Sequence, residues 1–152
     1  GVTHIIGSHP HVIQPIELRT NGNQQHAIVY SLGNFISNMS AANTDGGLIF
    51  TLQLEKYPLP KPIRPLQNHS NHSPSPESFA SSFPFARVVR CGYTLVWTGR
   101  PTLTGEKNYI LYPSYSPHSH LPQSARNHLN IFIKNTRKFL IQHNTEIYEN
   151  NK

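Results

Sequence analysis

The sequence predicts an α/β fold in which one C-terminal helix covers a mostly antiparallel sheet. Before residue 114, short apolar runs alternate with turn residues, which is typical of strands. Between residues 122 and 143, apolar residues recur at spacings of three and four, which is typical of an amphipathic helix. The chain has 152 residues, of which 36% are hydrophobic, so we expect residues 1–152 to form one domain with a modest core.

The first predicted unit is a β-hairpin. An apolar run at 12–18 and a second at 26–32 flank the turn sequence Thr20-Asn21-Gly22-Asn23. An Asn-Gly pair supplies the positive φ angles of a tight turn, so the two runs should pair in antiparallel fashion. This pairing would bring residues 30–35 back to the start of the hairpin.

Further strands are predicted at 48–54, 87–98 and 107–112, with 99–105 forming a turn between the last two. Together with the first hairpin they would make a single antiparallel sheet. Trp97 and the tyrosines are expected in the core and rim of this sheet. Residues 57–85 are rich in Pro, Ser and His. Repeated Pro removes backbone donors and disfavours both helices and central strands, so this segment is predicted to form a long mobile insertion. His69 and His72 within it are interpreted as loop residues rather than metal ligands.

The C-terminal helix is predicted over about 122–143, within the segment 120–145. Pro122 suits its first turn, and one face carries apolar or small side chains that should cover the sheet. These are Ala125, Leu129, Phe132, Ile133, Thr136 and Leu140. The basic residues of the helix are interpreted as a solvated face, with membrane-surface binding as the alternative. His118 and His120, before the helix, are interpreted as loop residues.

Charge and cysteine content exclude some classes of protein. The formal net charge is +6, but the 13 Lys and Arg residues are spread from Arg19 to Lys152 and Arg137-Lys138 is their only adjacent pair. Tracking of phosphates requires clustered cations, so we do not expect a nucleic-acid partner. Cys91 is the only cysteine, which excludes an internal disulfide. The chain begins almost directly in a strand, at residues 2–6, and we interpret it as a fragment that lacks upstream sequence.

The most specific chemical signal is a pair of histidines on either side of one proline. The apolar run at 2–6 leads into Gly7-Ser8-His9-Pro10-His11. Neutral imidazole is the commonest metal ligand, and a stiff turn can aim two rings at one point. The alternative for His9 and His11 is an ordinary surface turn.

A second polar group is expected near the first. Gly33 would let the backbone leave the second strand of the hairpin, and Asn34 follows it. The amide of Asn34 could ligate a metal through oxygen or bind a substrate oxygen. Its alternative is a plain turn residue.

Taken together, these stretches resemble a known family. Residues 6–15, Ile-Gly-Ser-His-Pro-His-Val-Ile-Gln-Pro, and residues 28–35, Ile-Val-Tyr-Ser-Leu-Gly-Asn-Phe, resemble the C-terminal signature of the CapA (PgsA) family. Thr44-Asp45-Gly46-Gly47 continues the resemblance, and residues 92–97 and 109–113 are similar to closing strands of bacterial members. These are proteins of capsule or poly-γ-glutamate synthesis. The resemblance implies the C-terminal half of a calcineurin-like metallophosphoesterase fold, a β-sandwich flanked by helices.

The resemblance also implies site residues. Metallophosphoesterases bind two metals, and their last motif contains Gly-His-x-His. His9 and His11 match its two histidines. Ser8 lies between Gly7 and His9, so the glycine is one place out of register. Contacts that support the site or touch substrate would come from Ser8, Gln14, Tyr30, Ser31, Gly33 and Asn34. A dimetal site needs a bridging carboxylate, yet Asp45 is the only Asp and lies in a turn. The other ligands must therefore lie upstream, and we expect this fragment to be inactive by itself.

Two functions are compatible with this resemblance. In the first, the complete protein is a metal-dependent hydrolase that uses divalent ions, two of them in the complete site. In the second, it is a noncatalytic module that binds or anchors a polyanion and has kept the fold. Both imply an anionic polymer or its precursor as partner, other capsule-synthesis membrane proteins as further partners, and an extracytoplasmic or membrane-associated location.

Overall fold

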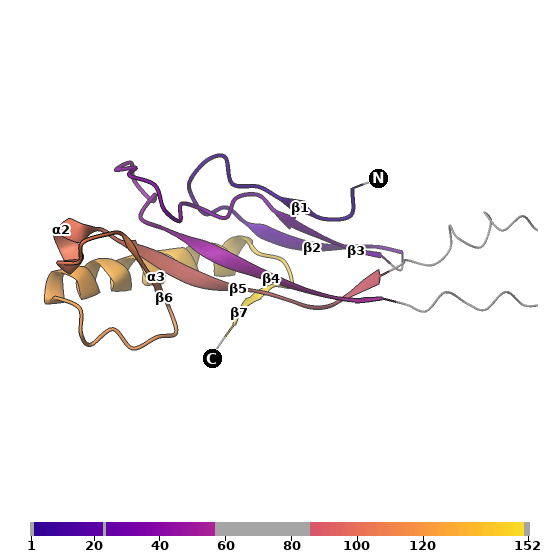
Figure 1. The fold of residues 1–152 in the computed structure, drawn as a ribbon. Helices are drawn as coiled ribbons and strands as arrows, with labels where there is room; N and C mark the ends of the chain where they lie inside the picture. The colour runs from indigo at the N-terminus through magenta and orange to yellow at the C-terminus, as the bar shows by residue number, and fades with distance from the viewer. Residues whose placement is uncertain (1, 23, 57–85, 151–152) are drawn as a thin grey trace, which may run out of the picture.

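The computed structural model describes residues 2–22, 24–56 and 86–150 (Figure 1). In chain order these residues form β1 (Ile5–Ile6), β2 (Ile16–Asn21), β3 (Gln24–Val29), β4 (Gly46–Lys56), β5 (Ala86–Gly99), α2 (Pro101–Thr104), β6 (Ile110–Pro113), α3 (Gln123–His143) and β7 (Tyr148–Glu149). The mixed α/β class predicted from the sequence is confirmed. The predicted insertion at 57–85, with His69 and His72, lies outside the described residues.

The first sheet has three strands in the order β1-β3-β2. β2 and β3 pair in antiparallel fashion from Ile16↔Val29 to Asn21↔Gln24, which confirms the predicted hairpin. β1 pairs with β3 in parallel. The predicted start of the first strand at residue 12 is wrong, because regular pairing begins only after Pro15, which has no N–H to donate to a ladder.

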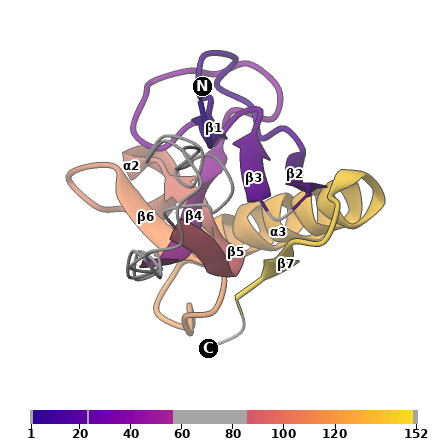
Figure 2. The same ribbon diagram turned by 90° about the vertical axis from the view of Figure 1, so that its right-hand side faces the viewer.

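The second sheet has four strands. β5 is its centre, because β4 pairs along one edge of β5 and both β6 and β7 pair along the other. Figure 2 shows the strands of both sheets nearly end-on. The predicted strands at 48–54 and 87–98 are confirmed by β4 and β5, which pair in antiparallel fashion. The strand predicted at 107–112 is confirmed only in its second half, because β6 begins at Ile110. The predicted turn at 99–105 instead contains the single helical turn α2, which ends at Gly105 with a left-handed φ of 79°.

The prediction of one antiparallel sheet is wrong, because the chain divides its strands between two sheets. The sheets are joined where residues 32–34 follow β3 and meet the start of β4. Here the N–H of Leu48 donates to the carbonyl of Leu32 at 2.8 Å, and the N–H of Asn34 donates to the carbonyl of Gly46 at 2.9 Å. This junction fixes Asn34 relative to both sheets.

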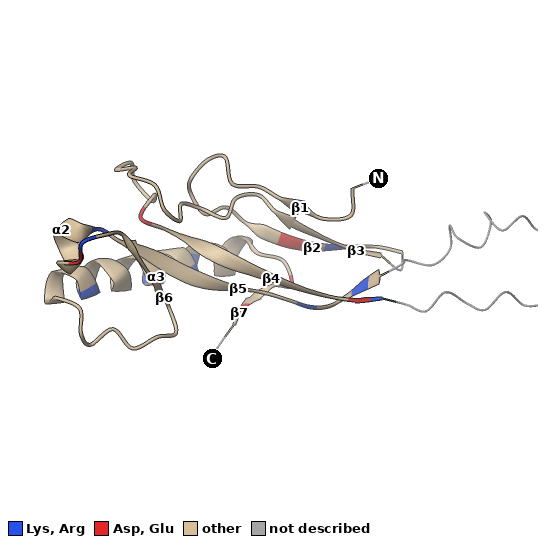
Figure 3. Ribbon diagram, viewed as in Figure 1, with Lys and Arg blue, Asp and Glu red and all other residues tan. Residues whose placement is uncertain are grey.

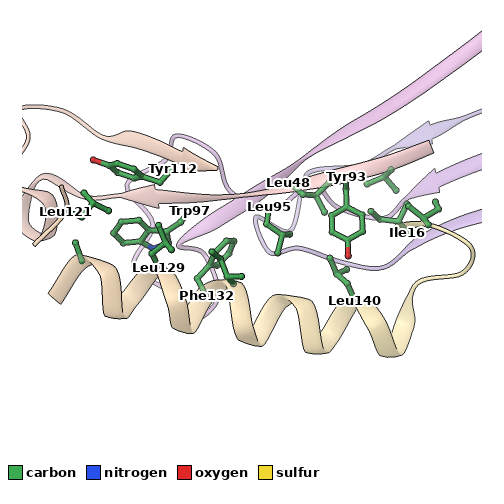
Figure 4. Packing of buried hydrophobic residues seen from close by; sticks show 14 residues of the cluster. Ile16, Leu48, Tyr93, Leu95, Trp97, Tyr112, Leu121, Leu129, Phe132 and Leu140 are labelled. Carbon is green, nitrogen blue, oxygen red and sulfur yellow. The ribbon is translucent and has the colours of Figure 1, made fainter. Parts of the chain in front are cut away.

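Helix α3 confirms the predicted C-terminal helix, and it packs along the face of the second sheet (Figures 1 and 4). Five of the six residues predicted to face the sheet are buried, and the sixth, Thr136, is half-buried. The five buried residues share one core cluster with Trp97, Leu95 and Tyr93 of β5, and Trp97 and Tyr93 were predicted there. Burial of each large apolar side chain contributes about 1.5–3 kcal/mol, so this layer is a main source of stability. Within the described part of the chain, no helix is apolar and long enough to cross a lipid bilayer.

The end of α3 is tied back to the first sheet. The side-chain oxygen of Asn144, which follows the helix, accepts a hydrogen bond of 2.8 Å from the backbone N–H of Ile16. Thr145 then exchanges backbone hydrogen bonds with Ile16 and Leu18. The helix is therefore held against both sheets, and it positions them relative to each other.

Candidate functional site: a histidine loop held by a buried asparagine

The loop that carries His9 and His11 is anchored at Gly7. The N–H of Gly7 donates to the carbonyl of Val29 at 2.8 Å, and its carbonyl accepts from Leu32 at 2.9 Å. A Cβ at Gly7 would lie 2.3 Å from the carbonyl oxygen of Tyr30, so only glycine allows this approach. The loop is thereby fixed beside the segment that carries Asn34.

Beyond Gly7 the chain makes a tight turn. The N–H of His11 donates to the carbonyl of Ser8 at 3.3 Å, so residues 8–11 form a closed four-residue turn around Pro10. His11 itself has a left-handed φ of 57°. A residue with a side chain adopts this conformation at a cost in free energy, and such residues cluster at functional sites.

The structure brings His11 and Asn34 together. Their side-chain atoms Nδ1 and Oδ1 lie 3.2 Å apart, within hydrogen-bond distance. Asn34 is 2% exposed, whereas His11 is exposed to solvent. One imidazole of the predicted pair is therefore oriented by a buried amide from the neighbouring hairpin.

The hydrogen-bond partners of Asn34 decide which ring nitrogen of His11 is free. The Nδ2 group of Asn34 donates to the carbonyl of Thr44 at 2.7 Å, and a carbonyl can only accept. The oxygen of Asn34 must then face His11, so a neutral His11 carries its proton on Nδ1. Its Nε2 lone pair is left available for a metal ion, the arrangement in which ligating histidines are normally held.

His9 lies one residue before Pro10 and is exposed. It makes no hydrogen bond with another residue of the described chain, so nothing holds its ring in the way that Asn34 holds His11. Among the described residues, no three His, Cys, Asp or Glu side chains come together. The structure therefore orients one imidazole of the loop, that of His11, and a metal site here would need ligands from outside the described residues as well.

The other predicted site residues have structural roles near the loop. The carbonyl of Ser8 closes the turn. Ser31 is fully buried, and its carbonyl accepts a hydrogen bond of 3.2 Å from the N–H of Gln14. Gly33, with a φ of 86°, turns the chain toward Asn34. Tyr30 is directed to β2, where its hydroxyl donates to Glu17 at 3.2 Å and accepts from Arg19 at 3.2 Å. The ring of Tyr30 is therefore held by β2.

Two residues that hold Asn34 were not singled out from the sequence. Thr44 supplies the carbonyl that fixes the amide orientation. Thr98, on β5, donates through its hydroxyl to the carbonyls of Asn34 and Phe35 at 3.2 and 2.5 Å. Thr44 lies in the quoted motif at 44–47, but no local pattern marks Thr98, because its partners are 63 and 64 residues away.

A cavity of about 720 Å³ lies beside the loop, between residues 12–14, residues 40–45 and α3. Its lining includes Gln14, Asp45, Arg100 and His128. Gln14 is thus the predicted site residue that lines this cavity, and neither His9 nor His11 does. The cavity offers polar groups of both charges next to the histidine loop.

A third histidine near the loop has a structural role. His4 precedes β1, and its Nδ1 accepts a hydrogen bond of 3.1 Å from the N–H of Ala27 on β3. Burial and the neighbouring charge of His26 lower the pKa of His4 below its ordinary value. A neutral His4 keeps the Nδ1 lone pair that this bond requires, so His4 secures the strand that leads into the loop.

The fold and the loop define a mixed α/β protein in which a histidine loop is oriented by a buried asparagine. A family model described as bacterial capsule synthesis protein (PGA_cap) matches residues 1–39 of the 152. This segment contains His9, His11, Gly33 and Asn34, so the similarity covers the loop and its anchor. A search of curated proteins found no match, and a search of solved structures also found none.

Proposed function

We propose that this chain belongs to a metal-dependent protein of capsular polymer synthesis, export or anchoring, in which His9 and His11 supply two metal ligands. Further ligands would complete a site for divalent ions within a metallophosphoesterase-like β-sandwich flanked by helices. The proposed partners are an anionic polymer such as poly-γ-glutamate, or its precursor, and other capsule-synthesis membrane proteins. The proposed location is extracytoplasmic or membrane-associated.

The observation that carries this proposal is the contact between His11 Nδ1 and Asn34 Oδ1 at 3.2 Å. It supports a ligand role because it holds the ring in one tautomer and leaves Nε2 unprotonated. The cost of a left-handed backbone at His11 is also easier to explain if the side chain must point to one place. The family match over residues 1–39 supports the polymer-related role.

A bound divalent ion would supply Lewis-acid polarisation of a phosphoryl or carbonyl oxygen and would make water a stronger nucleophile, so the proposed activity is a hydrolysis. The residues of this chain would position that ion. His11 would be held by Asn34, and Pro10 would limit the freedom of His9. In the complete protein this arrangement fits cleavage of a phosphodiester or an amide bond.

The test uses the full-length protein. Divalent metal binding is measured by isothermal titration calorimetry, and turnover is measured with a phosphodiester and an amide model substrate. The double variant H9A/H11A should lose both metal binding and turnover. The double variant H120A/H143A removes two exposed imidazoles outside the loop and should keep both. Equal metal affinity in both double variants would refute the proposed ligands.

A noncatalytic polyanion-binding or anchoring module is the second candidate. It is favoured by a groove lined with Lys134, Lys138 and two arginines on the side of α3. The same experiment separates the candidates. Metal binding without turnover of either substrate favours the binding module, whereas turnover that depends on His9 and His11 favours the hydrolase.

A further inference from the structure

Arg100 lies between β5 and α2, and its side chain reaches the loop that runs from β3 to β4. Its Nη2 group donates a hydrogen bond to the carbonyl of Met39 in that loop. Arg100 forms no ion pair in the described part of the chain, although Asp45 lines the same cavity (Figure 3). A hydrogen bond from a charged donor is stronger than one between neutral groups. The side chain of Arg100 is therefore an anchor for the loop.

The backbone of Arg100 is itself fixed. Its carbonyl accepts hydrogen bonds from the N–H groups of Leu103 and Thr104, at 2.9 and 3.0 Å, and from the hydroxyl of Thr104 at 3.0 Å. Two residues earlier, on β5, the N–H of Thr98 donates to the carbonyl of Asp45 at 2.9 Å. The end of β5 is thus tied both to α2 and to the end of the loop, so the arginine side chain reaches the loop from a fixed base.

The loop carries a closed turn that ends at Thr44, a residue that is 3% exposed. The hydroxyl of Thr44 donates to the carbonyl of Ala41 at 2.7 Å, and its N–H donates to the same carbonyl at 3.4 Å. Asn43, inside this turn, has a left-handed φ of 63°. The hydroxyl oxygen of Thr44 also lies 3.4 Å from the carbonyl oxygen of Met39, which Arg100 binds. The turn and the point held by Arg100 are therefore in direct contact.

The carbonyl of Thr44 decides which way the Asn34 amide faces. It accepts from Nδ2 of Asn34 at 2.7 Å, and this leaves Oδ1 toward Nδ1 of His11 at 3.2 Å. Without a carbonyl in this place, the amide is free to rotate by half a turn and to present Nδ2 to His11. His11 would then accept at Nδ1 and carry its proton on Nε2. In that tautomer Nε2 cannot bind a metal ion, because a ligating nitrogen must be unprotonated.

We propose that Arg100 is a positioning residue for His11. It acts through residues 39–44, which place the carbonyl of Thr44, and then through the amide of Asn34. Arg100 forms no hydrogen bond with His11 itself, so its effect is on the tautomer of the ring. The consequence for metal binding rests on the ligand role proposed for His11, whereas the consequence for the tautomer does not.

The test measures the tautomer of His11 by ¹⁵N NMR of the full-length protein, labelled with ¹⁵N-histidine and kept in chelator. At about pH 8.5 ordinary imidazoles are neutral, and their nitrogen shifts report which nitrogen carries the proton. H11A identifies the His11 signals by their loss, and N34A gives the signals of an unrestrained ring. The wild type should carry its proton on Nδ1, and R100Q should move the His11 shifts toward those of N34A.

R100M keeps the apolar stem of the arginine side chain and should give the same shift as R100Q, so a folding defect in one variant does not decide the result. The matched control is R90Q, which removes the same charge from an exposed arginine of β5 and should match the wild type. Circular dichroism checks that each variant is folded.

Calorimetry with Zn²⁺, an ion that imidazole ligands suit, separates this proposal from the metal proposal. R100Q should bind Zn²⁺ about tenfold more weakly than the wild type, because it loosens a group that orients a ligand. If the tautomer shifts but the wild type binds no metal, the proposed function fails and the role of Arg100 stands. The role of Arg100 is overturned if folded R100Q and R100M keep the wild-type tautomer, or if R90Q shifts it equally. It is also overturned if wild-type His11 does not carry its proton on Nδ1.

Discussion

Gly33 and Gly47 face each other in an isolated antiparallel bridge at the junction of the two sheets. A Cβ at Gly33 would lie 2.7 Å from the Ile13 side chain and 2.8 Å from the carbonyl oxygen of Gly46. A Cβ at Gly47 would lie 2.9 Å from the carbonyl oxygen of Leu32. The two backbones approach this closely only because both residues lack a side chain. The bridge in turn sets the position of Asn34.

The variant Gly33→Ala should therefore be strongly destabilised. The left-handed φ of 86° alone costs about 1–2 kcal/mol for a residue with a Cβ. The clash with backbone atoms adds to this, so we expect a total loss of about 3 kcal/mol or more in the free energy of unfolding. Urea denaturation measures it. Gly105→Ala is the control, because its φ of 79° is similar but no atom lies within 4 Å of the added Cβ. Equal losses in both variants would contradict the close approach.

Asn34→Ala should affect both stability and metal binding. It removes the bonds to Thr44 and His11 and leaves the Thr44 carbonyl without its partner, which costs about 1–3 kcal/mol. Loss of the group that orients His11 should weaken metal binding by about 10–100-fold. Denaturation and calorimetry measure the two effects. Asn108→Ala, at an exposed position, should change neither.

Asn34→Asp separates the two roles of the amide. The carboxylate keeps an oxygen toward His11 but cannot donate to the carbonyl of Thr44. We expect a loss of stability larger than that of the alanine variant, because a buried carboxylate then faces the carbonyl of Thr44, with metal affinity retained. If Asn34→Asp and Asn34→Ala lose metal affinity equally, Asn34 does not act by orienting His11.

The elements that local pattern defines were predicted well. The period of α3, the apolar runs of β4 and β5 and the turn residues around Gly22 each lie within a short window of sequence. Pairings between distant segments were not predicted. β1 pairs in parallel with β3, which lies more than 20 residues later in the sequence. β7 is only two residues long, which is too short to give a recognisable pattern. The division into two sheets depends on the bridge at Gly33 and Gly47, which no local pattern encodes.

The candidate site was only partly predicted, because it also depends on contacts between distant segments. The hairpin predicts that Asn34 returns toward His11, and the two side chains do meet. The orientation of the Asn34 amide depends on Thr44 and the position of its backbone depends on Thr98, both of which reach it through tertiary contacts. The cationic groove on α3 was hidden because its residues are dispersed in sequence, and it needs the segment 114–119 as its second wall.

The ion pair between Arg137 and Glu149 predicts a pH dependence of stability. Burial raises the pKa of Glu149, but hydrogen bonds from Arg137 and Ser114 and the charge of Arg137 lower it by more, to below its ordinary value of 4.5. A carboxyl whose pKa is lowered by folding stabilises the fold above its ordinary pKa. That contribution is lost as the pH falls through the folded value.

Thermal unfolding between pH 3 and 7 tests this ion pair. The wild type should lose stability below about pH 4.5. Glu149→Gln should lose less stability than the wild type over that range. At pH 7 it should be less stable than the wild type by about 1 kcal/mol, a small value because Arg137 is partly exposed. Glu106→Gln changes an exposed carboxyl without an ion-pair partner in the described chain and should follow the wild type. Identical acid profiles for Glu149→Gln and wild type would show that the pair does not contribute.

Leu140 and Ile141 are neighbours on α3 that test how the helix packs. Leu140 is fully buried in the core, whereas Ile141 is 79% exposed. Leu140→Ala should lower the free energy of unfolding by about 2–5 kcal/mol, because it leaves a cavity between α3 and the sheet. Ile141→Ala removes a similar side chain from the surface and should change stability by less than about 0.5 kcal/mol. If denaturation gives similar losses for both variants, α3 does not face the sheet through the stripe that contains Leu140. The groove between α3 and segment 114–119 would then need a different helix orientation.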